Sequence, residues 1–248
     1  MPVATSPSAA HRVLTGLTLP GSVRVGMMEI PIRRLASGCV ALDTILNGGL
    51  PRGRLTELTG ATTSGKTAVL LAFLAAATQE GEVTALIDLP DALDPRTAAA
   101  AGIELKRMLW VRPPTVSVGL RCAELLLEAG GFGLIAIDLG ALPPWQLRAP
   151  VWPRLVRAAE RSDIALAVIA PHRVAGSFAA LSLAIAARGT QWQRGAWPLF
   201  DGIRLRLTIA RNKLGAPGRS LVIRARDSCS VTESSYALTT TSREDEAR

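Results

Sequence analysis

The sequence is poor in the residues that build metal centres and disulfide frameworks. It has three cysteines, Cys39, Cys122 and Cys229, without motif spacing, and two histidines, His11 and His172, that are far apart. An odd number of unpatterned cysteines is no disulfide scaffold and is typical of a protein from a reduced compartment. Two isolated histidines offer no metal cluster. We therefore expect a cytoplasmic protein without a structural metal.

Long apolar runs are also missing. The longest, 68–77, is too short to cross a bilayer, so we expect no membrane partner. The opening stretch "MPVATSPSAAHRVLTG" has no basic patch followed by an apolar segment, and no secretory signal is expected.

Lysine is scarce, with only Lys66, Lys106 and Lys213, yet the formal net charge is +8 because arginine supplies nearly all the positive charge. A basic excess favours an anionic partner such as nucleic acid or nucleotide. A coding bias toward arginine is an equally open explanation. With 248 residues, 48% of them hydrophobic, the chain is long enough for one sizeable α/β core.

The pattern of apolar runs predicts an α/β fold with a mostly parallel sheet flanked by helices. Strands are expected at 55–58, 83–88, 108–111, 134–138 and 165–170, alternating with helices at 66–81, 94–102, 117–130 and 151–162. Runs at 181–187, 203–211 and 221–226 follow without helices between them, which predicts antiparallel strands added at the C-terminal end. We expect a flexible arm over 1–30, a core over 31–228 and a polar, disordered tail over 229–248.

The stretch "GATTSGKT" fits the phosphate-binding loop pattern G-x-x-x-x-G-K-[ST] between a strand and a helix. Small residues let backbone N–H groups surround a phosphate, and the helix N-terminus adds a positive dipole end. The lysine supplies a charge to the β- and γ-oxygens, and the last threonine can ligate Mg²⁺. The predicted nucleotide-binding residues are Gly60, Ala61, Thr62, Thr63, Ser64, Gly65, Lys66 and Thr67.

A carboxylate near the Mg²⁺ is expected from "LIAID", which places Asp138 at the carboxyl end of a buried strand. Open α/β sheets position ligand-facing residues at that end. A loop-capping aspartate is the alternative. The predicted metal ligands are thus Thr67 and Asp138.

Three segments in order resemble the RecA ATPase family: "SGCVALDTILNGGLPRGRLTELTGATTSGKT", "IDLPDALDP" and "RNKLGAP". The resemblance covers roughly 36–226 and implies a RecA-like P-loop core with ATP and Mg²⁺ as ligands. At this reduced size the chain is most similar to the ImuA type, which is encoded with an inactive-type Y-family polymerase and an error-prone replicative polymerase. That implies a role in the SOS response and translesion mutagenesis. The implied partners are ImuB-type polymerase subunits, RecA and single-stranded DNA.

Departures from the family bear on catalysis. The water-activating glutamate of the family falls on Pro90, and its γ-phosphate-sensing glutamine falls on Pro171. Proline has no side-chain group that accepts a proton. The adenine-contacting aspartate is retained as Asp94, while the stacking aromatic falls on Thr97. The resemblance therefore implies ATP binding with weak or absent hydrolysis and no assignable catalytic residue.

The regions by which the family grips DNA also depart from the pattern. The loop after 134–138 is short and proline-rich, and the loop after 165–170 is nearly deleted. The long N-terminal helix through which RecA protomers polymerise is not evident. These departures disfavour a filament-forming recombinase.

A basic segment remains as a candidate surface for DNA or a partner. In "IRLRL", the two arginines share one strand face and the aliphatic residues share the other. The candidate residues are Arg188, Trp192, Arg194, Arg204, Arg206, Arg211 and Lys213. A solvated strand face with tryptophans packed as a lid is an equally open alternative, as is core packing for Trp145 and Trp152.

Three functions remain open. The preferred one is a nucleotide-binding accessory protein of DNA damage tolerance. An active DNA-dependent ATPase of recombinational repair is the first rival, disfavoured by Pro90 and Pro171. A scaffold with vestigial ATP binding is the second, disfavoured by Lys66 and Thr67.

Overall fold

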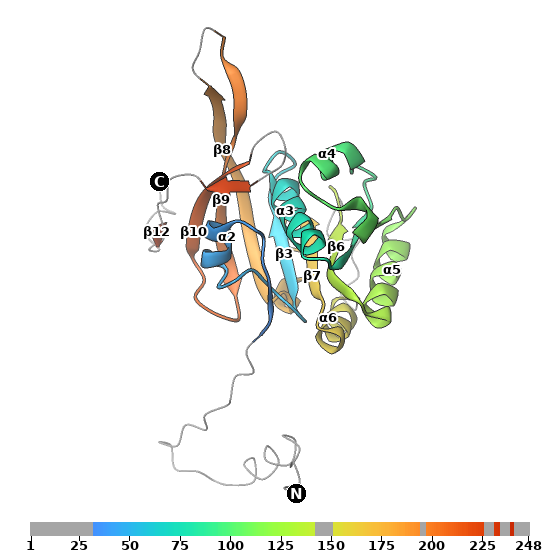
Figure 1. The fold of residues 1–248 in the computed structure, drawn as a ribbon. Helices are drawn as coiled ribbons and strands as arrows, with labels where there is room; N and C mark the ends of the chain where they lie inside the picture. The colour runs from blue at the N-terminus through green and yellow to red at the C-terminus, as the bar shows by residue number, and fades with distance from the viewer. Residues whose placement is uncertain (1–31, 142–150, 194–196, 226–230, 234–238, 241–248) are drawn as a thin grey trace, which may run out of the picture. The chain divides into compact units, whose positions relative to one another are not determined.

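The fold is built around a ten-stranded sheet (Figure 1). A computed structural model describes residues 32–141, 151–193, 197–225, 231–233 and 239–240. Nine strands lie in the order β11-β10-β9-β8-β3-β7-β6-β4-β5, and β12 pairs with β10. Two further strands, β1 (Arg34–Leu35) and β2 (Leu50–Pro51), form a small antiparallel sheet of their own.

The half of the sheet from β8 to β5 is parallel. Its strands are β3 (Leu55–Thr59), β4 (Val83–Asp88), β5 (Met108–Val111), β6 (Phe132–Asp138), β7 (Ala165–Ala170) and β8 (Leu181–Gln193). The helices are α2 (Val40–Ile45), α3 (Lys66–Gln79), α4 (Pro95–Ala100), α5 (Val116–Ala129) and α6 (Val151–Ser162), with 3₁₀ turns η1 (Leu105–Arg107) and η3 (Gly176–Phe178). This arrangement confirms the predicted α/β class.

Antiparallel strands complete the other half. They are β9 (Leu199–Asn212), β10 (Arg219–Ala225), β11 (Val231–Glu233) and β12 (Thr239–Thr240). The last two lie within the range expected to be a disordered tail, so the sheet continues past 228. They are two or three residues of polar, β-branched sequence, too short for a period-two pattern to reveal. The predicted arm over 1–30 lies outside the described residues.

Alternating side chains give the sheet two buried faces, because successive residues of a strand point to opposite sides. On β3, Leu58 packs under α2 and α3, while Leu55 packs under α5 and α6. The same parity continues along β4 and β6 and places Asp88 and Asp138 on the α3 side. Both carboxylates thus end strands on the face where the phosphate-loop helix begins.

The loop after β7 is folded back onto the α6 side of the sheet. Glu57 of β3 is 1% exposed and accepts hydrogen bonds from the backbone N–H groups of Val174 (2.8 Å) and Ala175 (2.6 Å) and from the hydroxyl of Ser182 (2.9 Å). Ala175 also belongs to the core on that side. A buried carboxylate surrounded by donors therefore anchors this loop.

None of the helices in the described ranges is long and apolar enough to cross a bilayer.

Candidate nucleotide site

The stretch "GATTSGKT" forms a tight loop between β3 and α3 (Figure 1). Lys66 begins the helix, is 7% exposed, and donates from Nζ to the carbonyl oxygen of Ala61 (3.1 Å). Ser64 donates from its backbone N–H to the same residue (3.0 Å), while its buried side-chain oxygen has no hydrogen-bond partner. Thr62 and Thr63 are exposed at the rim. The Lys66 amine thus bonds to a carbonyl oxygen of the loop itself. A bound phosphate would be the alternative partner for that amine.

Two glycines make this loop possible. Gly65 has φ of 82°, and a Cβ there would lie 2.6 Å from Leu205 of β9. A Cβ on Gly60 would collide with the carbonyl oxygen of Ile185 on β8. The loop therefore sits directly against the β8–β9 strands, and only glycine fits at both positions.

Asp88 and Asp138 end adjacent strands directly opposite one another in register. Burial, followed by the neighbouring Asp88, raises the pKa of Asp138, and a hydrogen bond from the backbone of Gly140 (2.8 Å) and the charge of Lys66 only partly offset this. Two carboxylates side by side at a strand end are an arrangement that a divalent cation neutralises. The sequence had pointed to Asp138 alone.

A cavity of about 280 Å³ extends from these carboxylates along α3 to the start of α4. Its lining residues are Thr67, Ala68, Leu70, Leu71, Leu86, Asp88, Ala92, Leu93, Asp94, Thr97 and Asp138. The structure thus brings together the residues proposed for Mg²⁺ at one end of the cavity and the residue proposed for the base at the other.

Asp94 is the N-cap of α4. Its Oδ1 accepts from the backbone N–H of Arg96 (3.2 Å), and its Oδ2 accepts from the backbone N–H (2.9 Å) and hydroxyl (2.6 Å) of Thr97. The bonds from Thr97, then the one from Arg96, lower the pKa of this exposed carboxyl. Pro95 at the first helical position has its φ fixed for the helix. The carboxylate is therefore ionised and held in one orientation.

The family model for the RecA N-terminal domain matches residues 21–146, just over half of the 248-residue chain. The chain belongs to the RecA family.

RecA proteins from individual bacteria match the same part of this RecA-family chain. Protein RecA of Clostridium acetobutylicum is 40% identical over 125 residues, which is 49% of the chain and 36% of that RecA. Protein RecA of Clavibacter michiganensis subsp. michiganensis is 41% identical over 128 residues, or 50% of the chain and 35% of that RecA. The chain therefore spans about a third of the length of the RecA proteins it matches.

A solved structure confirms the fold. The crystal structure of the RadB recombinase aligns with a TM-score of 0.63 over 81% of this RecA-family chain and 99% of RadB, at 17% identity. At that identity, the likeness concerns the architecture of the sheet and its helices.

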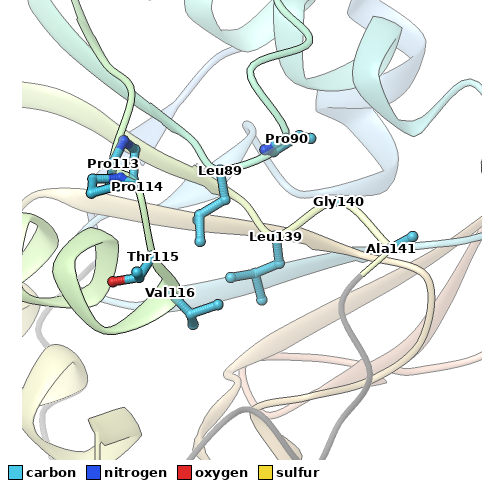
Figure 2. Close-up of a pocket in the computed structure, with 9 residues that line it drawn as sticks. All are labelled: Leu89, Pro90, Pro113, Pro114, Thr115, Val116, Leu139, Gly140 and Ala141. Carbon is cyan, nitrogen blue, oxygen red and sulfur yellow. The ribbon is translucent and has the colours of Figure 1, made fainter.

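Pro90, the residue predicted to replace the family's water-activating glutamate, lies at an apolar pocket in this RecA-family member (Figure 2). The pocket, about 510 Å³, lies at the ends of β4 and β6 and the start of α5, and its lining contains no acidic side chain. The lining residues are Leu89, Pro90, Pro113, Pro114, Thr115, Val116, Leu139, Gly140 and Ala141. Figure 2 shows the ring of Pro90 near Gly140, where a Cβ would lie 3.2 Å from that ring.

The acid next in sequence points elsewhere. Asp91 has a positive φ of 52° and faces the guanidinium of Arg112 at 3.7 Å. Arg112 lies over the ring of Trp110 (4.7 Å), and the Trp110 indole N–H donates to Asp88 (3.1 Å). Asp88 also accepts the backbone N–H groups of Ala92 (3.2 Å) and Leu93 (2.9 Å). This network holds the loop between β4 and α4 in place.

The described candidate residues for DNA or a partner fall into two groups. Arg188, Trp192, Arg204 and Arg206 are exposed on the β8–β9 hairpin, and Arg194 lies outside the described residues. Arg211 and Lys213 instead donate to the carbonyl oxygens of 176 and 177 in the loop after β7. The structure therefore does not bring all seven to one surface.

Replacing Asp138 by asparagine is expected to raise the melting temperature of the ligand-free protein at neutral pH by a few degrees. A raised carboxyl pKa means that the ionised form costs stability, so stability is gained as pH falls through that pKa. The neutral amide should remove this pH dependence and the repulsion from Asp88. It should also remove the Mg²⁺-dependent part of nucleotide binding.

Thermal unfolding between pH 4 and 8, with and without Mg-ATP, measures both effects. Glu128→Gln removes one charge from an exposed helix position and is the control. A lower melting temperature for Asp138→Asn would contradict the prediction, because it would mean that the carboxylate stabilises the ligand-free fold.

Proposed function

We propose that this RecA-family chain binds Mg-ATP with weak or absent hydrolysis and acts as an accessory protein of DNA damage tolerance. The observation that carries the proposal is the contrast between the two sides of the β4 and β6 ends. On the α3 side, Lys66, Asp88 and Asp138 converge beside the phosphate loop. On the α5 side, the pocket at Pro90 is lined by proline and aliphatic groups without an acid.

The residues present suit the ligand. The buried Ser64 hydroxyl without a partner is a feature of a loop shaped around an anion, and Gly60 and Gly65 let that loop pack against β8 and β9. Lys66 would exchange its bond to a carbonyl for the phosphate charge. Thr67 and Asp138 would hold Mg²⁺, directly or through water, and Asp94 would accept from the base. The metal would supply charge neutralisation at the phosphates.

Slow ATP hydrolysis is expected because of the residues that stand at the predicted positions of the family's catalytic groups. A positioned general base is typically worth about 10²–10⁴-fold in rate. Pro90 cannot accept a proton, Asp91 is turned to Arg112, and Pro171 offers no side-chain hydrogen bond to a γ-phosphate. Bound ATP would then act as a long-lived structural ligand rather than as a source of free energy through hydrolysis.

An accessory role is supported by the loop after β7. In the family this loop grips DNA, but here its backbone is bonded to buried Glu57, and its carbonyls accept from Arg211 and Lys213. Because both its backbone N–H groups and its carbonyl groups already have partners within the protein, this loop is poorly placed to rearrange around a DNA strand. Together with the resemblance to the ImuA type, this favours action through an ImuB-type polymerase subunit or RecA.

The test is a paired measurement on the full chain: nucleotide affinity, and phosphate release with and without single-stranded DNA. We expect binding with turnover that DNA does not stimulate. Robust DNA-stimulated hydrolysis, abolished by Lys66→Ala, would replace the proposal with an active DNA-dependent ATPase.

The partner is tested separately by titrating the purified chain, with and without Mg-ATP, against a purified ImuB-type polymerase subunit and against RecA. Binding that strengthens with nucleotide is expected. Absence of binding to either protein in both conditions would contradict the accessory role while leaving the nucleotide site intact.

A further inference from the structure

Helices α5 and α6 lie side by side and cover one face of the sheet (Figure 1). The inner side of each helix packs into the core, and the outer sides of the two helices together form one surface. The phosphate loop leads into α3, which packs on the opposite face of the sheet. Whatever binds the outer surface of α5 and α6 therefore does not compete with the nucleotide site.

The outer side of α5 carries an apolar row. Residues three or four apart on a helix are neighbours on one side, and the row follows that spacing with Val118, Cys122, Leu125 and Ala129. Val118 is 43% exposed and Leu125 is 49% exposed. The core side of the helix is a different set, Gly119, Leu120, Ala123, Glu124 and Leu127. A surface helix normally has polar residues opposite its core side, so the fold of the chain alone does not account for this row.

The outer side of α6 carries an arginine row. Arg154, Arg157 and Arg161 follow the same helical spacing, and all three are exposed. Arg154 lies 2.7 Å from the buried carboxylate of Glu124 on α5, which also lies 3.1 Å from Arg121. One carboxylate thus serves two guanidinium groups. Arg157 and Arg161 form no ion pair with any described residue, so the row keeps an excess of positive charge.

The apolar row and the arginine row together are called here the α5–α6 face. Between the carboxyl ends of the two helices it contains a pocket of about 280 Å³, lined by Leu127, Glu128, Gly130, Ala158, Arg161 and Ser162. The other exposed acid of α6, Glu160, is already 3.1 Å from Arg54. The face therefore combines exposed aliphatic groups, a small hollow and arginines that are free to pair with acids.

The dimensions of the face suit one helix. Val118 to Leu125 and Arg154 to Arg161 each span seven residues, or about 10 Å of helix axis. Packed helices lie about 8–10 Å apart, and a helix with its side chains is about 10–12 Å across. A partner helix of two to three turns, laid over α5 and α6, would therefore contact both rows at once.

The chemistry of the face selects the kind of helix. Apolar residues at helical spacing would cover the aliphatic side chains of α5, and carboxylates on the adjacent side of the same helix would meet the arginines of α6. A DNA duplex would meet the arginines with its phosphates, but its polar backbone would leave Val118 and Leu125 uncovered. The combination of the two rows thus favours a protein helix over nucleic acid.

We propose that the α5–α6 face binds an acidic amphipathic helix of a partner protein. The apolar side of that helix lies on Val118 and Leu125, and its carboxylates pair with Arg157 and Arg161. The proposal rests on the accessory role, because that role supplies a protein partner, and it assigns the surface through which the partner is held. It involves neither the nucleotide site nor the β8–β9 strands.

The arginines are tested by charge reversal. The probe is a labelled peptide of about 18 residues, long enough to form a helix on the surface, with leucines along one side and glutamates along the adjacent side. A second peptide has lysines in place of the glutamates. In fluorescence anisotropy, the wild type should bind the glutamate peptide in preference. Arg157→Glu with Arg161→Glu should weaken that binding by about tenfold and strengthen binding of the lysine peptide.

The matched control for charge is Arg96→Glu with Lys106→Glu. Both residues are exposed, and they lie in α4 and η1, whose neighbouring Ala98 and Ile103 belong to the core on the α3 side of the sheet. The control makes the same change in net charge, so it should bind both peptides like the wild type. An equal loss in the control would mean that only the overall charge of the chain matters, and would overturn the proposal.

The apolar row is tested by Val118→Gln with Leu125→Gln, which keeps residues that a helix tolerates. This variant should bind the glutamate peptide about fivefold or more weakly, because the aliphatic area that the peptide would cover is lost. Val40→Gln with Leu105→Gln is the control. These residues are 69% and 40% exposed on α2 and η1, and their replacement should leave peptide binding unchanged.

The same variants are titrated against the purified ImuB-type subunit, RecA and duplex DNA. If the wild type binds either protein and the α5–α6 variants bind it equally well, the face is wrong and the accessory role stands. If the wild type binds neither protein, the accessory role fails and the glutamate peptide alone decides the face. Absence of peptide binding, or a loss confined to DNA, would overturn the proposal. The Mg-ATP-induced rise in melting temperature should persist in every variant, which shows that each is folded.

Discussion

Lys66→Ala is expected to abolish the stabilisation that Mg-ATP gives to the folded chain. A ligand that binds only the folded state at about 100 times its Kd adds roughly 2.7 kcal/mol to the free energy of unfolding. For a chain of this size, that corresponds to a rise in melting temperature of about 5–10 °C. The Lys66 amine is nearly buried within the phosphate loop, and alanine leaves neither the charge nor the reach to a β- or γ-oxygen.

Thermal unfolding with increasing Mg-ATP measures the effect, and Lys106→Ala is the control. Lys106 is exposed and only 3.7 Å from Glu104, a surface pair of small energetic value, so its variant should respond to nucleotide like the wild type. No shift for the wild type at millimolar nucleotide would favour a scaffold with vestigial binding. A shift that persists in Lys66→Ala would place the nucleotide elsewhere.

Returning the two catalytic groups should accelerate hydrolysis. With Pro90→Glu and Pro171→Gln together, we expect turnover to rise by about 10²-fold or more over the wild type, the lower end of what a general base contributes. Pro90 is exposed at the end of β4, two residues after Asp88, so a carboxylate there costs no burial. Pro171 directly follows β7, beside the phosphate loop, where the Ala170 carbonyl accepts the N–H of Gly60 (3.3 Å).

Phosphate release at saturating Mg-ATP is the measurement. Pro114→Glu places a carboxylate on the opposite wall of the same pocket, away from the β4 end, and should leave turnover unchanged (Figure 2). An equal rise in that control would point to a general charge effect. Turnover that stays at the wild-type value in the double variant would mean that the loop holds position 90 away from the γ-phosphate.

Continuous apolar patterns made most of the fold predictable. Helix α6 and strand β7 occupy the expected ranges, 151–162 and 165–170. A long amphipathic run predicts a helix, and a short, fully apolar run predicts a buried strand. The outer half of the β8–β9 hairpin was not predicted as strand. Most of its described side chains are exposed, so no alternation of apolar and polar side chains marks it.

The candidate site was likewise only partly predictable from the sequence. The phosphate loop and Asp138 were visible because a spaced motif and a strand end carry them. Glu57 and Asp88 were missed, since each is a single acid in an apolar strand. The donors to Glu57 are distant in sequence, and those to Asp88 are backbone N–H groups of the following loop and the indole of Trp110, which no motif marks. The sequence did not decide whether Trp152 and Trp192 pack in the core or face solvent. In the structure, Trp152 is 2% exposed and lies in the core, whereas Trp192 is exposed on the hairpin.

The cap of α4 has a consequence for which base the cavity would accept. A carboxylate offers about four acceptor directions, and at Asp94 three are already taken by Arg96 and Thr97. One direction remains, from Oδ1, and the helix that fixes it also prevents the side chain from rotating away. Under the proposed contact, an amino group on the base would bind an acceptor that is already oriented. Binding would therefore cost no rotamer entropy at the Asp94 side chain. A base with a carbonyl at that position would meet the fixed negative charge of Asp94, so the helix cap itself would favour an amino-bearing base such as adenine over guanine or uracil.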